Sequence, residues 1–265
     1  MPELPNVEFL KRYFKNNSLH KKIIDIKCEA KSLIKKIDFK DFKKKLIGKS
    51  FKDAWRRGKF LIIEVSGMNE KLIFHFGMSG DLHYIKQGKE RRGEDRFTRL
   101  CFKFANGYEL RWLNMRKLGK IYLTESKKIK LIEEIGPEPL ELSEDGFLKL
   151  LANYQQKNLK AFLMDQRNIA GIGNVYSDEI LFQAKISPHR KIEDLTQKEK
   201  KLLFQKTRYV LTKATKDLIS LREFPKSWLE PHRHTDLICP RNKNHKLIRE
   251  IIAGRSAIFC SICQK

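Results

Sequence analysis

The sequence has 265 residues, 41% of them hydrophobic and 17 of them phenylalanine, which is enough to bury the core of one large domain or two. Lysine and arginine number 56 against 32 acidic residues, and the resulting net charge of +24 favours a polyanionic partner, most often nucleic acid. No apolar run reaches the length of a membrane span, and no apolar signal segment opens the chain. Five cysteines, an odd count, argue against a disulfide framework.

The chain opens Met-Pro-Glu-Leu-Pro, and Pro2 allows two interpretations. If Met1 is removed, Pro2 becomes a terminal secondary amine that is partly unprotonated near neutral pH. Such an amine can attack an electrophilic carbon and form a Schiff base, and Glu3 beside it can move protons. The plain alternative is that a proline at this position marks nothing, and these few residues alone favour it.

The first half predicts one helix followed by strands. Apolar residues recur at helical spacing over Asn6–Phe14, which predicts an early helix. Five alternating or apolar blocks follow, and Asn106-Gly107, which divides the fourth block into two runs, predicts a hairpin. We therefore expect an antiparallel β domain, closed as a sandwich or barrel, with Lys86–Arg96 as a solvated loop. The blocks lie at residues 22–30, 49–65, 71–85, 98–113 and 119–125.

The pattern changes near residue 137, where two prolines interrupt the strand-like blocks. Ser143 and Gly146 then predict a helix start, and helical periodicity continues to about Leu221. Its last part, residues 198–220, predicts one long helix. The remaining segment, Trp228–Lys265, contains the three clustered cysteines.

These C-terminal cysteines have metal-ligand spacing. Cys260 and Cys263 lie three residues apart, and Cys239 with His245 supplies an upstream pair, which predicts a structural zinc site with three thiolates and one imidazole. His232 and His234 are rival fourth ligands, and a degraded site without metal is the alternative. Arg255 lies at the tip of the expected hairpin or just after it, where a cation suits phosphate contact or simple solvation.

Together these motifs resemble the formamidopyrimidine-DNA glycosylase / endonuclease VIII family of base-excision repair enzymes. The resemblance runs nearly end to end, and its motifs follow in the family's order. It rests on PELP followed by VE at the N-terminus, RRGKFL (Arg56–Leu61), HFGMSG (His75–Gly80), RKLG (Arg116–Gly119), IGPEPL (Ile135–Leu140), LMDQRNIAGIGNVYSDEILF (Leu163–Phe182) and RSAIFCSICQK (Arg255–Lys265).

The resemblance implies an α+β fold of three domains. These are an N-terminal β-sandwich with a flanking helix at residues 1–135, a helix–two-turn–helix domain at 143–224, and a zinc-finger hairpin at 228–265. It also implies a bifunctional enzyme that flips a damaged base out of duplex DNA. Pro2 would attack the sugar, Glu3 would protonate the ring oxygen, and Lys59 would contact phosphate near the lesion. β- and δ-elimination would then cut the strand.

The resemblance assigns DNA contacts as well. Three residues would fill the gap left by the flipped base, with the arginine facing the orphaned partner: Met78, Arg116 and Leu118. Four others match phosphate-contacting positions: His75, Lys160, Asn174 and Arg255. Asn174 follows Gly-Ile-Gly at an expected helix start, where free backbone N–H groups favour a phosphate. Capping by Asn174 and a buried, hydrogen-bonded His75 are the plain alternatives.

Four departures from the family pattern bear on the lesion. Leu118 replaces the commoner phenylalanine, Asn114-Met115 replaces Asp-Pro, and Asn6 replaces a glutamate. The segment before Cys239 is short and lacks both the Gly-rich loop and the Tyr-Gly-Arg motif of relatives that recognise 8-oxoguanine. Oxidised purines (formamidopyrimidines and 8-oxoguanine) remain the first expectation. Oxidised pyrimidines, hydantoins and bare abasic sites are the alternatives.

Two further functional alternatives stay open. One is a lyase that cuts only at abasic sites, and the other is a non-catalytic damage-binding protein that kept the fold. Pro2, Glu3 and Lys59 are all present, which favours the enzyme. We expect a monomer, because no coiled-coil seam is visible, and a bacterial-type cytoplasmic location at the nucleoid.

Overall fold

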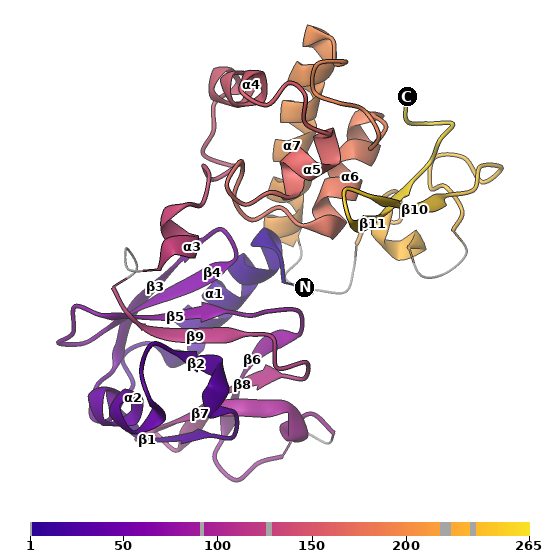
Figure 1. Cartoon of the computed structure of the whole chain (residues 1–265). Helices are drawn as coiled ribbons and strands as arrows, with labels where there is room; N and C mark the ends of the chain where they lie inside the picture. Colours follow the sequence, from indigo (N-terminus) through magenta and orange to yellow (C-terminus); the bar gives the residue numbers. More distant parts are fainter. Residues whose placement is uncertain (1, 91–92, 126–128, 218–223, 234–236) are drawn as a thin grey trace. The chain divides into compact units, whose positions relative to one another are not determined.

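The computed structural model describes residues 2–90, 93–125, 129–217, 224–233 and 237–265. The chain divides into two compact units that share its N-terminal residues: Pro2 and Asn6–Glu134 belong to the first, and Glu3–Pro5 and Ile135–Lys265 to the second. Figure 1 shows sheets in the first unit, and helices with one small hairpin in the second. This confirms the predicted α+β class. Among the described residues, no helix is long and apolar enough to cross a membrane.

The first unit contains two sheets. One has the strand order β1-β7-β8-β6 and the other β2-β9-β5-β4-β3, and every pair is antiparallel except β2 with β9. The elements are α1 (Leu4–Ser18), β1 (Ile23–Cys28), η1 (Lys31–Leu33), β2 (Ile34–Lys35), α2 (Phe39–Leu46), β3 (Phe51–Arg57), β4 (Phe60–Val65), β5 (Lys71–His75), β6 (Gly80–Lys86), η2 (Asp95–Phe97), β7 (Thr98–Phe104), β8 (Tyr108–Asn114), β9 (Lys120–Thr124) and α3 (Lys130–Glu133).

One apolar core joins the two sheets. Phe51 of one sheet meets Phe102 of the other edge-on, with ring centroids 5.5 Å apart, and α1 adds Val7 and Phe14 to the same core. Burying such rings is the main favourable contribution to folding. The predicted hairpin is confirmed, because Asn106 and Gly107 join β7 to β8 and Gly107 has φ +81°. The first unit is therefore the expected sandwich, with α1 packed on it.

The second unit begins with a helical bundle, made of α4 (Glu144–Ala152), α5 (Leu159–Met164), α6 (Asn174–Ala184) and α7 (Gln197–Asp217). Ser143 caps α4 as predicted, because its hydroxyl accepts the Gly146 N–H at 3.1 Å. Thr196 and Glu199 form a reciprocal capping box at the start of α7. The α5–α6 pair, joined by residues 165–173, is the expected helix–two-turn–helix.

The remaining residues form a 3-10 turn, η4 (Glu230–His232), and a hairpin of β10 (Ile248–Ile252) and β11 (Arg255–Phe259). Ala253 and Gly254 make its turn, with φ of 51° and 71°, and this left-handed pair matches the twist of a tight hairpin. Ile258 of β11 packs with Phe182 of α6 in a small core of its own. The hairpin therefore packs against α6.

Candidate active site and DNA-binding residues

The chain's N-terminus is fastened to the start of α6 by Glu3. The Glu3 carboxylate is buried and accepts three backbone N–H groups, from Gly173 at 2.7 Å, Val175 at 2.9 Å and Tyr176 at 3.2 Å. Leu4 adds a backbone hydrogen bond to the carbonyl of Gly171 at 2.9 Å. A carboxylate at a helix N-terminus is favoured by the helix dipole as well as by these bonds. Glu3, and with it the attachment point of Pro2, is therefore held rigidly.

The Gly-Ile-Gly sequence is needed for this attachment. A Cβ at Gly173 would lie 2.4 Å from the Glu3 carboxyl carbon, so only glycine lets the carboxylate reach the backbone. Gly171 has φ +80°, and a Cβ there would lie 2.7 Å from Cβ of Leu4. Both glycines thus serve the docking of residues 3 and 4.

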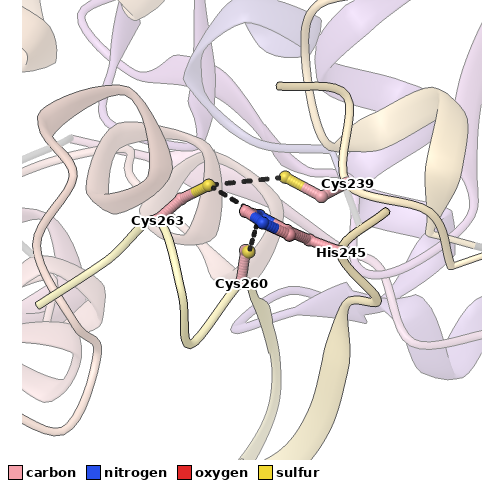
Figure 2. A group of neighbouring side chains, drawn as sticks. All are labelled: Cys239, His245, Cys260 and Cys263. Atoms are coloured by element: carbon pink, nitrogen blue, oxygen red, sulfur yellow. Dashed lines mark hydrogen bonds between the residues drawn. The ribbon is translucent and has the colours of Figure 1, made fainter. Parts of the chain in front are cut away.

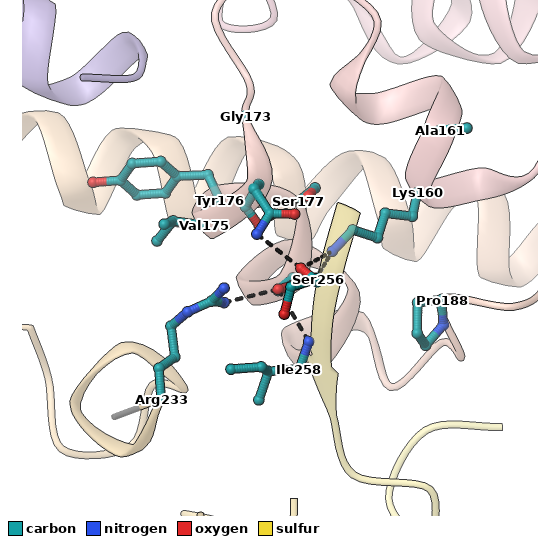
Figure 3. Close-up of polar contacts among 12 residues, drawn as sticks. Lys160, Ala161, Gly173, Val175, Tyr176, Ser177, Pro188, Arg233, Ser256 and Ile258 are labelled. Carbon is teal, nitrogen blue, oxygen red and sulfur yellow. Dashed lines mark hydrogen bonds and ion pairs between the residues drawn. The ribbon is translucent and has the colours of Figure 1, made fainter. Parts of the chain in front are cut away.

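This attachment corrects one expectation about the start of α6. The N–H groups predicted to be free for a phosphate are those of the first turn, and Glu3 already occupies three of them. Asn174 begins the helix as predicted, but it is not the cap. Its side-chain amide donates to the carbonyl of Ser256 at 2.8 Å (Figure 3). The N–H of Asn174 is not one of the three that Glu3 binds, so a phosphate contact at this place would use that N–H or the Asn174 side chain.

Lys59 and His75 lie together at one end of the second sheet. Lys59 is buried in the turn between β3 and β4, after Gly58 with φ +53°. His75 ends β5 and pairs with Phe60 and Lys120 in the sheet register. Its ring packs against the Phe60 ring at a tilt of 52°, with ring centroids 5.0 Å apart. A second lysine, Lys120, thus lies beside the two predicted residues, and the sequence did not point to it.

His75 is neutral at physiological pH. Burial, followed by the positive charges of Lys59 and Lys120, lowers the pKa of His75 to about 4. Its Nδ1 accepts the Gly77 N–H at 3.3 Å, which leaves the proton on Nε2. The imidazole is therefore a neutral N–H donor with charged lysines beside it, a combination suited to a phosphate oxygen.

Lowering the pH from 6.5 to 4 is expected to destabilise the first unit through His75. The unfolded chain protonates this imidazole near pH 6.5 and the folded chain near 4, so the unfolded state binds the extra proton in between. Stability is retained above 6.5 and falls towards 4. Allowing for partial solvent exposure, we expect the wild type to lose about 2 kcal/mol more than His75→Gln over this range. Urea unfolding at several pH values checks this, and parallel curves for the two proteins would contradict it.

The predicted gap-filling residues lie on two neighbouring turns of the first unit. Met78 is on the β5–β6 turn, and Arg116 and Leu118 are on the β8–β9 turn. Met78 is 43% and Leu118 48% exposed. The Ser79 hydroxyl accepts the Arg116 N–H at 3.0 Å and links the two turns. These side chains are apolar, exposed and close to a cation, as an insertion into stacked bases requires.

Asn114 determines the path of the second turn. Its buried amide donates to the Phe76 carbonyl at 3.0 Å and accepts the Leu118 N–H at 3.2 Å. The Asn114-Met115 pair, where relatives carry Asp-Pro, therefore still organises the turn. It also leaves a further apolar side chain in solvent, because Met115 is 53% exposed.

Lys160 does not suit the phosphate contact predicted for it. Its side chain is fully buried, and its ammonium is bound by the carboxylate of Asp178 and by the carbonyl of Ser256 at 3.2 Å (Figure 3). Burial lowers the pKa of Lys160, and Asp178 opposes that shift. In this structure the ammonium faces protein groups, so the prediction of a direct contact is not supported. Asp178 was not singled out from the sequence.

Four side chains in the second unit form a candidate metal centre (Figure 2). They are the predicted set Cys239, His245, Cys260 and Cys263, and their ligand atoms all lie within 4.8 Å of one another. His232 is not part of this group, because its ring contacts the carbonyl of Lys226 at 3.0 Å. His234, the other rival ligand, lies outside the described residues.

The spacing of these atoms fits a tetrahedral ion. Zinc–sulfur bonds of about 2.3 Å and zinc–nitrogen bonds of about 2.0 Å place ligand atoms roughly 3.5–3.8 Å apart. The Cys239 and Cys263 sulfurs are 3.8 Å apart, and the His245 Nδ1 lies 3.5 Å from Cys263 and 3.9 Å from Cys260. The donor set is that of a closed structural site, with no position left for a substrate.

Arg255 was predicted at the tip of the hairpin or just after it, and it lies directly after the turn as the first residue of β11. It is exposed and can reach a ligand in solvent. Its neighbour Ser256 is the residue whose carbonyl receives Asn174 and Lys160. Side chains of α5 and α6 thus hold the strand that presents Arg255.

Two family models match this chain. The formamidopyrimidine-DNA glycosylase N-terminal domain matches residues 1–121, and the formamidopyrimidine-DNA glycosylase H2TH domain matches residues 135–224. The formamidopyrimidine-DNA glycosylase of Carboxydothermus hydrogenoformans is 35% identical, with 100% of both chains covered. That of Mycoplasma genitalium is 30% identical over 100% of this chain and 96% of its own.

Solved structures agree with this similarity. One is a complex of the wild-type Lactococcus lactis enzyme with DNA containing N7-benzyl-Fapy-dG, at a TM-score of 0.86, 30% identity and full coverage of both chains. Another, described as MutM in complex with DNA containing carbocyclic 8-oxo-G, has a TM-score of 0.85 at the same identity and coverage.

Proposed function

Because the chain belongs to the formamidopyrimidine-DNA glycosylase family, we propose that it removes oxidised bases from duplex DNA through a Schiff base on Pro2. At the level of the family, the protein is a base-excision DNA glycosylase with abasic-site lyase activity, and its partner is damaged DNA. Formamidopyrimidines and 8-oxoguanine are the proposed first substrates. The short segment before Cys239 is the reason to test oxidised pyrimidines and hydantoins beside them.

The single observation that supports this chemistry most is the anchoring of Glu3 on α6. It holds the residue after the proposed nucleophile in one place, and such positioning is a large part of catalysis. The nitrogen of Pro2 forms a bond to the anomeric carbon of the sugar while the bond to the base breaks, and the proton that the nitrogen loses neutralises the departing base. Glu3 relays a second proton, taken up from solvent water, to the ring oxygen, so the ring opens and an iminium ion forms.

Elimination follows from that iminium ion. It acidifies the neighbouring carbon, whose proton is removed as the bond to the 3′ oxygen breaks, and a second elimination releases the 5′ oxygen. No oxidant or reductant is needed, and hydrolysis of the remaining iminium frees Pro2 for another round. Lys59 and neutral His75 would hold a phosphate next to the lesion.

The DNA contacts proposed are those that the structure leaves accessible. Met78, Arg116 and Leu118 would fill the gap left by the flipped base, and Leu118 would wedge without stacking. Asn174 and Arg255 would bind phosphate. Lys160 is omitted from this set, because its ammonium is buried against Asp178.

We also propose that the Cys239, His245, Cys260 and Cys263 cluster holds one zinc ion. Zinc would supply folding energy to the hairpin, since two strands alone are marginally stable. The proposed division into residues 1–135, 143–224 and 228–265 assigns that hairpin to a zinc-finger domain of its own. A monomer in a bacterial-type cytoplasm remains the proposed setting.

Borohydride trapping tests this function. Protein freed of Met1 is incubated with duplexes carrying 8-oxoguanine, an oxidised pyrimidine or an abasic site, then reduced, and the adduct is mapped by mass spectrometry. We expect an adduct on Pro2 with at least one base lesion and with the abasic duplex. A protein with one alanine added before Pro2 is the matched control, because its proline nitrogen is an unreactive amide.

The other outcomes distinguish the alternatives. An adduct with the abasic duplex alone indicates a lyase without glycosylase activity. Tight binding of every duplex with no adduct would overturn the catalytic proposal and leave a damage-binding protein.

A further inference from the structure

A buried ionic cluster connects four segments of the second unit. Lys160 of α5 is 0%, Asp178 of α6 1% and Arg233 after η4 5% exposed. Asp178 binds the Lys160 ammonium through Oδ1 and accepts the Arg233 guanidinium through Oδ2 at 2.8 Å. Oδ2 also accepts the backbone N–H of Ile258, on β11, at 3.2 Å. Lys160, Arg233 and Ile258 thus converge on one carboxylate (Figure 3).

The same cluster covers one edge of the hairpin. Among the described residues, β11 pairs with β10 along one side only, so its other edge has backbone groups without a described strand partner. On that edge, the Ser256 carbonyl accepts Asn174 at 2.8 Å and Lys160 at 3.2 Å, and the Ile258 N–H goes to Asp178. Side chains of α5 and α6 therefore replace a third strand, which satisfies the edge and fixes its register.

Burying these charges is costly for stability alone. Two cations share one buried carboxylate, and a second carboxylate, Glu230, lies 3.4 Å from the Arg233 guanidinium. An apolar cluster of similar volume often stabilises a fold as well as, or better than, a buried cluster of charged side chains. A charged cluster instead adds directionality, because each of its hydrogen bonds to β11 can form only at one position of this strand along α6. The cluster is thus suited to setting geometry.

Two proposed phosphate contacts depend on that geometry. Arg255 is exposed and directly precedes Ser256, while Asn174 starts α6 and touches the Ser256 carbonyl. A shift of β11 by one residue would point Ser256 away from α6 and move Arg255 with it. The distance between Arg255 and Asn174 is therefore fixed only while β11 stays hydrogen-bonded to Asp178 and Lys160.

We propose that Asp178 is a positioning residue for DNA binding, which locks β11 onto α6 so that Asn174 and Arg255 bind the phosphate backbone as one rigid surface. Lys160 acts through Asp178 and Ser256, without contacting DNA. This inference rests on the proposed function, because it assumes that Arg255 and Asn174 meet DNA. It assigns no part in the chemistry to Asp178.

Asp178→Asn in the full-length, zinc-containing protein tests the proposal. The amide keeps the size of the side chain but removes the negative charge that Lys160 and Arg233 share, and leaves Arg233 with Glu230 as its remaining carboxylate partner, so the strand edge is released. We expect hydrogen exchange of residues 256–259 to accelerate, and the Kd for a duplex with a tetrahydrofuran abasic analogue to rise about tenfold. The lyase rate on an abasic duplex, at saturating protein, should stay within about threefold, because Pro2 is untouched.

Asp165→Asn is the matched control. Asp165 also pairs with one lysine and one arginine, Lys157 at 2.9 Å and Arg167 at 3.2 Å, and it lies in the same unit without touching the hairpin. We expect this variant to retain native Kd and native exchange of residues 256–259. An equal rise in Kd for both aspartate variants would overturn the proposal, because it would indicate general destabilisation.

Lys160→Met provides the second variant if Asp178→Asn does not fold. It leaves Asp178 bound to Arg233 and Ile258, so we expect a smaller acceleration of exchange, a smaller rise in Kd and an unchanged salt dependence of binding. The double variant should be no weaker than Asp178→Asn alone, because both residues act on one strand edge. A salt slope reduced by about one charge, with native exchange, would show instead that Lys160 binds phosphate directly.

Two different results would show that the proposed function is wrong or that the positioning role of Asp178 is wrong. If the wild type gives no Pro2 adduct and no duplex binding, the function is wrong and Asp178 has nothing to position. If the wild type binds and reacts, but Asp178→Asn exchanges faster at native Kd, the function stands and the positioning role is wrong.

Discussion

Gly173→Ala is expected to lower the rate of base excision about 100-fold, although residue 173 carries no reactive group. Its new methyl would lie 2.4 Å from the Glu3 carboxyl carbon, and the carboxylate would have to leave the start of α6. Displacing a catalytic group by about 1 Å is enough for a loss of this size. Overpacking would also cost about 1–3 kcal/mol of stability in the second unit. Single-turnover excision and thermal unfolding measure the two effects.

Gly146→Ala is the matched control for that substitution. Gly146 lies in the first turn of α4, and a methyl there would approach the Ser143 hydroxyl at 3.2 Å and otherwise only Leu142 at 3.4 Å. We expect near-native excision, because alanine is a better helix former and no catalytic contact is involved. Native activity in Gly173→Ala would show that the attachment of Glu3 to α6 is not needed for the reaction.

Removal of zinc is expected to weaken binding of abasic-analogue duplex about 100-fold and to leave the first unit folded. Cys239, Cys260 and Ile258 belong to one small core, and without the ion the two cysteines are no longer held together in it. Strand β11 then no longer holds Arg255 in place. Losing Arg255 together with the Asn174 contact corresponds to roughly 3 kcal/mol of charge-assisted hydrogen bonding. Anisotropy binding before and after chelation, with metal analysis, tests this.

Two histidine variants sharpen that test. His245→Ala should lose zinc and duplex affinity together, because its Nδ1 lies 3.5 Å from the Cys263 sulfur in the cluster. His232→Ala should keep both, since the His232 ring contacts the Lys226 carbonyl at 3.0 Å and is not one of the four clustered ligand residues. Full zinc content in His245→Ala would refute the assignment of the fourth ligand.

Features with a local physical cause were predictable from the sequence. Asn106-Gly107 specifies a tight hairpin, Ser143 three residues before Gly146 specifies a cap, and Cys260 with Cys263 needs only one turn to face one ion. Their determinants lie within a few residues, so no tertiary information was required. The strand β2 was missed because it has only two residues. The helix α2 was missed although Asp38 caps it and Phe39, Phe42 and Leu46 recur at helical spacing, so its signal was present in the sequence.

The unpredicted features depend on long-range contacts. Lysine is rarely buried, so Lys160 looked like a surface cation, and only its contact with Asp178, 18 residues away, reverses that interpretation. No residue near Glu3 in the sequence indicates that its partners are residues 173, 175 and 176. For the same reason, the sequence did not predict that the Glu3 carboxylate binds N–H groups at the start of α6. The position of Lys120 beside His75 required the register of β5 with β9.

The separation of 170 positions between Glu3 and Gly173 has a consequence for synthesis of the protein. A ribosome that adds roughly 5–20 residues per second needs about ten to thirty seconds to pass from one partner to the other. Throughout that interval the nascent N-terminus has no α6 to bind, and an aminopeptidase can reach Met1. The proposed nucleophile, Pro2, is therefore accessible before its support exists, and the ability to cut DNA would be acquired only when translation of the second half is well advanced.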